Sequence, residues 1–388
     1  MIKKTADLTI LLFFFSFLTA QAYGGSNFKE VKLPDNIKAG IDHLRSISHH
    51  KTAVTFNPEA VNELLSFVVS PKPDDVRYYG PKTDGVNSAY SEFGINSGLA
   101  RILKYAFNPL IPSQVFRPSS VRYSSWRSID GAGKIPARFI EGMTDRSEPV
   151  IIRGIEREMT TPDVNTGGYY EYGSERTDIL MRHKGNNVFL SLTRQNGRST
   201  VGRKGGVIGA DDKWNYFYSG KEGLSRTGLG WVDSYIYSSL TLSVYYEIDG
   251  RKPFVKCGIL KWLSAGWAGI NVVGTIPIRV GLNRYARDFK IMMENSRLPA
   301  VKEMINRFSV FKGLSIDELK AKYVPYLAAI TSNYKNDKIL SRRSFSKLIK
   351  SGGYLNQMNR KELESALVLE EIKCIVGKNC NNHDTMRP

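Results

Sequence analysis

Acidic side chains lie close to tryptophans and tyrosines in the middle of the chain. Asp211 and Asp212 are adjacent, and Asp233 follows in the same region. Two carboxylates at a suitable separation can hydrolyse a glycosidic bond, one as the acid and the other as the base or nucleophile. We therefore take Asp211, Asp212 and Asp233 as candidate catalytic residues. The alternative is that they are solvated turn residues between strands.

Aromatic side chains are dense in the same region. Six of them are candidate ligand-binding residues: Trp214, Tyr216, Tyr218, Trp231, Tyr235 and Tyr237. Aromatic rings offer a large apolar surface, and Tyr and Trp add a polar group. As a group they favour a cavity for an apolar or ring-shaped ligand. The alternative is an ordinary sheet core, because Tyr and Trp are common in strands.

A basic, glycine-rich stretch at 197–209 resembles a phosphate loop at first sight. It departs from the nucleotide-binding pattern, because Arg203 takes the lysine position and Lys204 takes the hydroxyl position. We exclude nucleotide binding. Exposed backbone N–H groups beside Arg198, Arg203 and Lys204 could still bind an anion. The alternative is a flexible connection between strands.

The three cysteines indicate one disulfide at most. Cys374 and Cys380 are close together near the C-terminus, and a disulfide between them requires an oxidising compartment. Cys257 lies in a strand-like segment and is expected to be a buried thiol. His, Cys and acidic residues show no zinc-ligand spacing, so we predict no metal and no cofactor.

Residues 1–22 have the pattern of a secretory signal peptide. Lys3 and Lys4 precede an apolar run at 10–18, and Ala20 and Ala22 provide a cleavage site. The run is too short for a transmembrane helix, which needs about 20 residues. We expect cleavage near Ala22 and a periplasmic or secreted, bacterial-type protein.

The chain is strongly basic. It has 55 Lys and Arg against 37 Asp and Glu, a formal net charge of +18. Residues 281–350 hold 15 Lys and Arg and only 6 Asp and Glu. Outside the cytosol, anionic lipid headgroups or cell-wall polymers are better partners for such a protein than nucleic acid. The alternative is that the charge serves solubility alone.

The pattern of apolar residues divides the chain of 388 residues into five segments. These are a signal peptide at 1–22, a mixed helical region at 23–115, a β-rich domain at 116–280, a basic helical region at 281–372 and a tail at 373–388. Alternating patterns predict strands at 119–127, 150–159, 169–183, 188–194, 214–218, 231–247 and 254–262. The turn after His183 predicts a hairpin. Helical spacing begins near Leu282, and capping boxes at Ser315 and Asn359 open later helices.

These elements predict an α+β fold. An antiparallel β meander, either a curved sheet or a partial barrel, would be closed by the amphipathic helix near Leu282. Helical regions would lie at both ends. In outline this order resembles the helix-grip lipid-binding folds, and the resemblance implies a ligand between sheet and helix.

Three functions remain open on the sequence. The leading hypothesis is a non-enzymatic exported binding protein for an apolar or amphiphilic ligand, associated with anionic envelope surfaces. The second is a cell-envelope glycan hydrolase that uses carboxylates of the β-rich domain. The third is a structural or assembly factor of the envelope.

Overall fold

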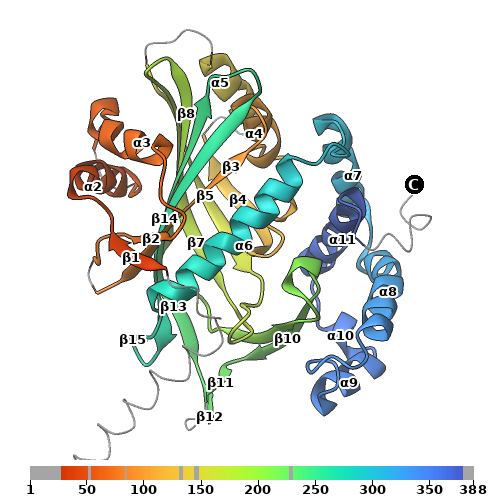
Figure 1. The fold of residues 1–388 in the computed structure, drawn as a ribbon. Helices are drawn as coiled ribbons and strands as arrows, with labels where there is room; N and C mark the ends of the chain where they lie inside the picture. Colours follow the sequence, from red (N-terminus) through yellow and green to blue (C-terminus); the bar gives the residue numbers. More distant parts are fainter. Residues whose placement is uncertain are drawn as a thin grey trace, which may run out of the picture.

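The computed structural model describes residues 28–50, 54–83, 85–130, 134–143, 148–226 and 230–378. A large antiparallel sheet lies at its centre, with helices on both faces (Figure 1). The predicted fold class is confirmed: the chain is α+β, and helices lie at both ends of the described sequence. Within the described residues the strands form an open sheet, as expected for a curved meander.

Eight strands make the large sheet in the described part of the chain. In spatial order they are β15 (Ile270–Asn271), β14 (Phe254–Trp267), β13 (Ser234–Ile248), β8 (Asn186–Asn196), β7 (Glu171–His183), β5 (Val150–Thr160) and β4 (Val121–Ile129), and β3 (Asn87–Ile95) pairs with β14. Apolar and polar residues alternate along β8 and β13, so the sheet has one apolar face and one polar face.

The predicted hairpin joins β7 and β8. His183 pairs with Asn186, which leaves Lys184 and Gly185 as a two-residue turn. Their φ angles are 49° and 85°. Two consecutive positive φ angles define the type I′ turn, whose twist matches that of the flanking strands.

The outer face of the sheet, defined as the face with Leu190, Leu242 and Leu260, is covered by two helices. These are α2 (Lys38–Ile47) and α3 (Asn62–Val69), which bury their apolar stripes against it. A short parallel pair, β1 (Lys29–Lys32) and β2 (Val76–Tyr79), lies beside them (Figure 1). This face is a conventional hydrophobic core.

The inner face, which carries Ser191, Ser243 and Lys261, is spanned by α6 (Thr275–Met293) (Figure 1). The apolar spacing predicts a start near Leu282, whereas the helix begins earlier, at Thr275. Pro277 is tolerated in the first turn because the N–H groups there have no partner within the helix. Two short helices, α4 (Leu99–Ala106) and α5 (Ile135–Gly142), contact one another near one end of the sheet.

The C-terminal helices are attached through β4 and a small second sheet. They are α7 (Val301–Gly313), α8 (Ile316–Asn333), α9 (Arg343–Lys350), α10 (Gly353–Asn356) and α11 (Arg360–Ile375). The small sheet consists of β6 (Gly168–Tyr169), β9 (Arg203–Val207) and β10 (Tyr216–Glu222), and β11 (Leu224–Arg226) pairs with β12 (Gly230–Val232). Both predicted capping boxes are present, at Ser315 and Asn359.

A buried ion pair fastens α11 to β4. Arg122 donates to Glu362 at 2.6 Å, and both side chains are nearly inaccessible to solvent. The guanidinium also stacks over the ring of Tyr218 at 3.7 Å.

The predicted domain boundaries at residues 115 and 280 stay predictions.

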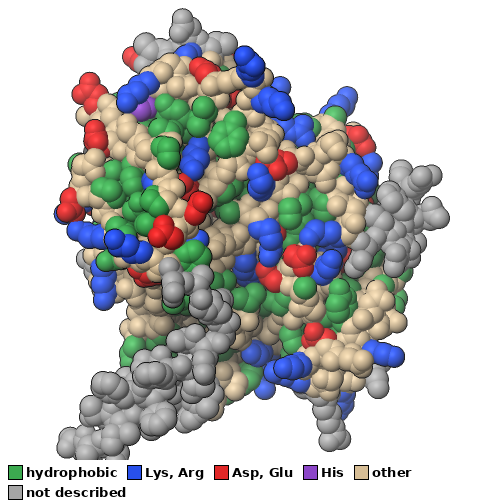
Figure 2. All heavy atoms as spheres, in the orientation of Figure 1, with side chains coloured by type: hydrophobic (Ala, Val, Ile, Leu, Met, Phe, Trp, Pro, Cys, Tyr) green, Lys and Arg blue, Asp and Glu red, His purple; other side chains and the backbone are tan. Residues whose placement is uncertain are grey.

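Lys and Arg side chains are spread over the face shown in Figure 2, with acidic side chains among them. No helix in the described ranges is long and apolar enough to cross a membrane.

Candidate ligand-binding cavity

A cavity of about 1420 Å³ lies between the inner face of the sheet and α6. Strands β5, β7, β8, β13 and β14 supply its floor, and α6 supplies one wall. The segment 106–121 supplies a second wall, and side chains of α7 and α11 reach the same space. Segments far apart in the sequence therefore build one site.

The floor consists mainly of polar side chains, which are arranged in rows across neighbouring strands. The threonine row, from β14 to β7, consists of Lys261, Thr241, Thr193 and Arg176. The serine row, one step along the same strands, consists of Ile259, Ser243, Ser191 and Asp178. Neighbours in such a row lie about 5 Å apart. All eight side chains line the cavity.

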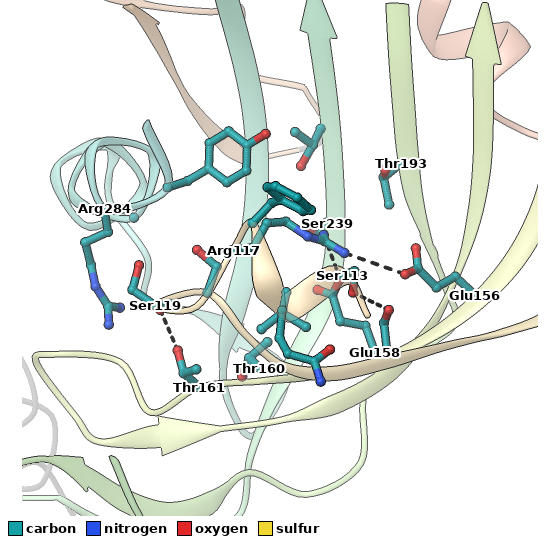
Figure 3. Close-up of a pocket in the computed structure, with 18 of the residues that line it drawn as sticks. Ser113, Arg117, Ser119, Glu156, Glu158, Thr160, Thr161, Thr193, Ser239 and Arg284 are labelled. Atoms are coloured by element: carbon teal, nitrogen blue, oxygen red, sulfur yellow. Dashed lines mark hydrogen bonds and ion pairs between the residues drawn. The ribbon is translucent and has the colours of Figure 1, made fainter. Parts of the chain in front are cut away.

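An ion-pair network holds Arg117 against the floor (Figure 3). Its guanidinium lies 2.9 Å from Glu158 and 3.6 Å from Glu156, and Glu156 also accepts from Arg176 at 2.7 Å. The hydroxyl of Tyr172 donates to Glu158 at 2.8 Å. Burial alone would raise the pKa of Glu156, but Arg176 and Arg117 outweigh burial and hold that pKa below its ordinary value.

Asp178 is a second kind of carboxylate in the floor. It is buried and accepts a hydrogen bond from the Ser191 hydroxyl at 2.7 Å. Burial raises the pKa of Asp178 to about 6, although Arg176 and the Ser191 bond act in the opposite direction. Asp178 can therefore exchange a proton near neutral pH.

Lys261 differs from the other cations of the floor. Its only described hydrogen bond goes to the Thr241 hydroxyl at 3.4 Å, and among the described residues no carboxylate lies at ion-pair distance. Burial lowers its pKa, partly offset by Glu158.

The wall opposite the floor is mainly apolar, although Arg284 of α6 also lines the cavity. On α6, Leu282 and Phe289 face the cavity, and Phe308 and Phe311 of α7 extend this surface. Near α4, ring contacts between Phe107, Phe189 and Tyr245 close one end, with centroids 4.5 to 5.9 Å apart. Tyr245 also shares a hydrogen bond of 2.7 Å with Tyr285 of α6.

Exposed apolar side chains mark the cavity mouth. Leu110, Val272 and Ile276 line the cavity and are 46 to 51% exposed. Large apolar side chains that are this exposed at the opening of a cavity indicate a binding surface. The cavity thus has a polar floor, an apolar wall and an apolar rim.

Three of the predicted ligand-binding aromatics lie elsewhere. Trp214, Tyr216 and Tyr218 are buried beside the C-terminal helices and do not line the large cavity. They border a void of about 20 Å³ with Tyr323 of α8. That space accommodates a water molecule but no organic ligand.

The other three predicted aromatics lie near the β13 end of the sheet. Tyr235 and Tyr237 are half-buried neighbours with ring centroids 6.3 Å apart, and Arg198 stacks over Tyr235 at 4.1 Å. Trp231 is 45% exposed, and Lys221 lies over its ring at 4.4 Å. They do not line the large cavity, and their role in ligand binding stays a prediction.

The predicted catalytic carboxylates do not belong to the cavity floor. Asp211 forms ion pairs with Arg284 at 2.6 Å and Arg287 at 3.0 Å, which ties the loop before β10 to α6. Asp212 is half-buried, and its carbonyl accepts from Lys378. Asp233 is exposed. Their catalytic role stays untested.

The predicted anion-binding residues lie on different surfaces. Arg198 stacks on Tyr235, whereas Lys204 donates to the Thr166 carbonyl at 2.6 Å. Arg203 and Lys204 are neighbours in β9, so their side chains point to opposite faces. Anion binding here stays a prediction.

Two predictions fall partly outside the described residues. Cys374 lies at the end of α11, but Cys380 and the signal segment 1–22 are not described. Cys257 is buried in β14, as expected, and burial raises the pKa of its thiol. No group of three His, Cys, Asp or Glu side chains in the described ranges has the arrangement of a metal site.

Sequence reasoning missed the residues that line the cavity floor. The signal was present in the strict alternation of Ser239, Thr241 and Ser243 with Leu240 and Leu242 along β13. Such alternation normally indicates a sheet with one face in water. Only the position of α6 shows that the polar face is covered.

Comparisons with protein-family models and with curated proteins find no match. Among solved structures, the lipid transfer and protein localization domain of human StarD13 (DLC2) is similar over 61% of this chain and 98% of its own. The identity is 12% and the TM-score is 0.24. A likeness of this strength assigns neither a fold nor a ligand.

Proposed function

We propose that the protein binds an amphiphilic molecule in the cavity between the sheet and α6, without catalysing a reaction. The observation that carries the proposal is the polar inner face, which is covered by a helix yet separated from it by about 1420 Å³ of open space. Direct packing of an apolar helix on the threonine and serine rows would leave buried polar groups unpaired, at about 1–3 kcal/mol each. A cavity avoids that cost.

The volume and the lining favour one class of ligand. Pockets for drug-sized molecules measure about 300–1,000 Å³, so this cavity accommodates a long chain or several rings. A purely polar ligand would leave the exposed lining residues Val272 and Ile276 uncovered, and a purely apolar ligand would leave Thr193 and Ser243 unpaired. An amphiphile satisfies both surfaces.

Extraction of the purified protein tests the proposal. The protein is denatured, extracted with organic solvent and analysed by mass spectrometry, with a protein of similar charge from the same preparation as control. A co-purifying amphiphile near one per chain supports the proposal. No amphiphile in the extract, together with no binding of added fatty acid, would contradict it.

The proposal includes export and attachment to an anionic envelope surface. It is supported by the signal-like segment 1–22 and by the net charge of +18. A mature protein that begins at Tyr23 in a periplasmic fraction supports export, and intact Met1 on cytosolic protein contradicts it. The Lys and Arg side chains in Figure 2 are spread over the surface, which favours long-range attraction to anionic vesicles. Salt screens such attraction, so binding to the vesicles should weaken as salt increases.

Asp178 favours one alternative, a hydrolase. A cavity carboxyl group whose pKa is raised to about 6 can serve as a general acid near neutral pH. If the protein cleaves a glycan, Asp178→Asn should abolish cleavage and Asp233→Asn should not. Cleavage that survives Asp178→Asn would remove Asp178 from any such mechanism.

A further inference from the structure

The inner face of the sheet contains two cations in one row, and their surroundings differ. Arg176 is paired with Glu156 at 2.7 Å and lies within the network that includes Arg117. Lys261, at the other end of the threonine row, has no carboxylate at ion-pair distance among the described residues. No described side chain therefore neutralises the ammonium group directly, and burial lowers its pKa, so an anionic group bound beside it would favour the charged form.

Hydroxyl groups extend from Lys261 along the same row. Thr241 is its partner in register on β13, and the Lys261 ammonium lies 3.4 Å from the Thr241 hydroxyl. Thr193 pairs with Thr241 on the next strand, and its side chain lies in the cavity (Figure 3). An ammonium and two hydroxyls spaced about 5 Å apart can all donate to one group with several oxygens.

The position of this trio agrees with an amphiphile. It lies on the floor, one step along the strands from the serine row, and Leu282 of α6 lines the facing wall. The cavity mouth, with Val272 and Ile276, is apolar. A polar group bound at the floor leaves an attached chain free to lie against α6 and extend towards the mouth.

We propose that Lys261, with Thr241 and Thr193, binds an anionic, oxygen-rich group, a carboxylate or a phosphate, at the polar end of the ligand. This inference rests on the proposed function and names the class of amphiphile. Both charged partners lie in a partly desolvated cavity, where a charge-assisted hydrogen bond is stronger than in water. Neutral and cationic amphiphiles gain no such interaction.

Binding of matched probes tests the charge of the ligand. Oleate, oleyl alcohol and 1-oleoyl lysophosphatidate, each below its micelle concentration, are titrated against the delipidated full chain. We expect one or both anions to bind about 10- to 100-fold more tightly than the alcohol. The tighter of the two distinguishes a carboxylate from a phosphate ligand.

Substitution of Lys261 connects this preference to the residue. Lys261→Met removes the charge and retains the length, so the anion preference should disappear while oleyl alcohol still binds. Lys261→Arg should retain the preference. The control is Lys252→Met, which changes an exposed lysine just before β14 and should change nothing.

The outcomes separate the two proposals. If Lys261→Met binds the anions as tightly as the unchanged protein, Lys261 is not the anion site and the cavity proposal stands. If none of the three probes binds the unchanged protein, the proposed function fails as well.

A measurement on the unchanged protein covers the case in which Lys261→Met does not fold. Reductive methylation, mapped by peptide mass spectrometry, should be slowed at Lys261 by the anionic probe and not at Lys252. Equal labelling with and without the probe would overturn the inference.

Discussion

Asp178 gives the cavity floor a measurable dependence on pH. Burial raises its pKa from 3.8 to about 6, and Arg176 and Ser191 only partly oppose this. A raised pKa means that the folded state favours the neutral form of this carboxyl group. Its contribution to stability is complete below pH 3.8 and is lost as the pH rises through about 6.

Asp178→Asn removes this titration with little change of shape. The Asn side-chain oxygen can still accept from the Ser191 hydroxyl, which now lies 2.7 Å from the carboxylate. A shift from 3.8 to about 6 corresponds to about 3 kcal/mol over the full range, and most of it falls between pH 4 and pH 8. The variant should therefore gain about 2–3 kcal/mol relative to the unchanged protein over this interval.

Urea denaturation at pH 4, 5, 6, 7 and 8 measures the difference in unfolding free energy between the two proteins. Asp233→Asn is the control, because Asp233 is exposed and its difference from the unchanged protein should stay nearly constant. If Asp178→Asn and the unchanged protein differ by the same amount at pH 4 and pH 8, Asp178 is ionised throughout. The argument that the floor is desolvated would then be refuted.

Four single substitutions and one double variant test the packing and backbone conformation of the fold around the cavity. Arg122→Met leaves the buried Glu362 carboxylate without its cation and should lower the unfolding free energy by about 3–5 kcal/mol. Glu362→Gln in the same chain should restore part of this loss. Urea denaturation in which the effects of the two substitutions simply add would contradict the ion pair. Gly154→Ala places a methyl group 2.7 Å from the indole ring of Trp126. The substitution should lower the unfolding free energy by about 1–3 kcal/mol and change the near-ultraviolet circular dichroism spectrum. Unchanged stability would refute the contact. Gly185→Ala, at a φ angle of 85°, should destabilise the protein by about 1–2 kcal/mol. Gly281→Ala, on α6 with open space around the added methyl group, should stabilise it by about 0.5–1 kcal/mol. Thermal denaturation in which both variants shift the melting temperature in the same direction would contradict this.

Local signals in the sequence were sufficient for most of the fold. The Lys184–Gly185 turn specifies the β7–β8 hairpin because both positions require positive φ. The capping boxes at Ser315 and Asn359 involve residues only three apart, so they can be identified without knowledge of the tertiary structure. Helical spacing placed the start of α6 one turn or more too late, because Pro277 in its first turn is typical of a break, although Ile278 continues the buried stripe.

The cavity could not be predicted from the sequence, because its side chains have ordinary patterns. Glu156 and Arg176 look like a surface ion pair on neighbouring strands, but Arg117 and the ring of Trp126 pack against them in the structure. Conversely, the aromatic row that begins at Trp214 indicated a ligand site. Its first members are instead buried against the C-terminal helices, where large rings fill space between strand and helix.

Blocking the cavity floor tests the central claim most directly. Ser243→Trp places an indole on the floor, whereas Ser238→Trp places one at an exposed position of the same strand. Each variant is compared with the unchanged protein in thermal denaturation and in titration with a fluorescent fatty acid. We predict saturable one-to-one binding to the unchanged protein and to Ser238→Trp, and at least a tenfold loss of affinity in a folded Ser243→Trp, since an indole occupies the ligand space. Undiminished binding by folded Ser243→Trp would show that the amphiphile does not occupy this cavity.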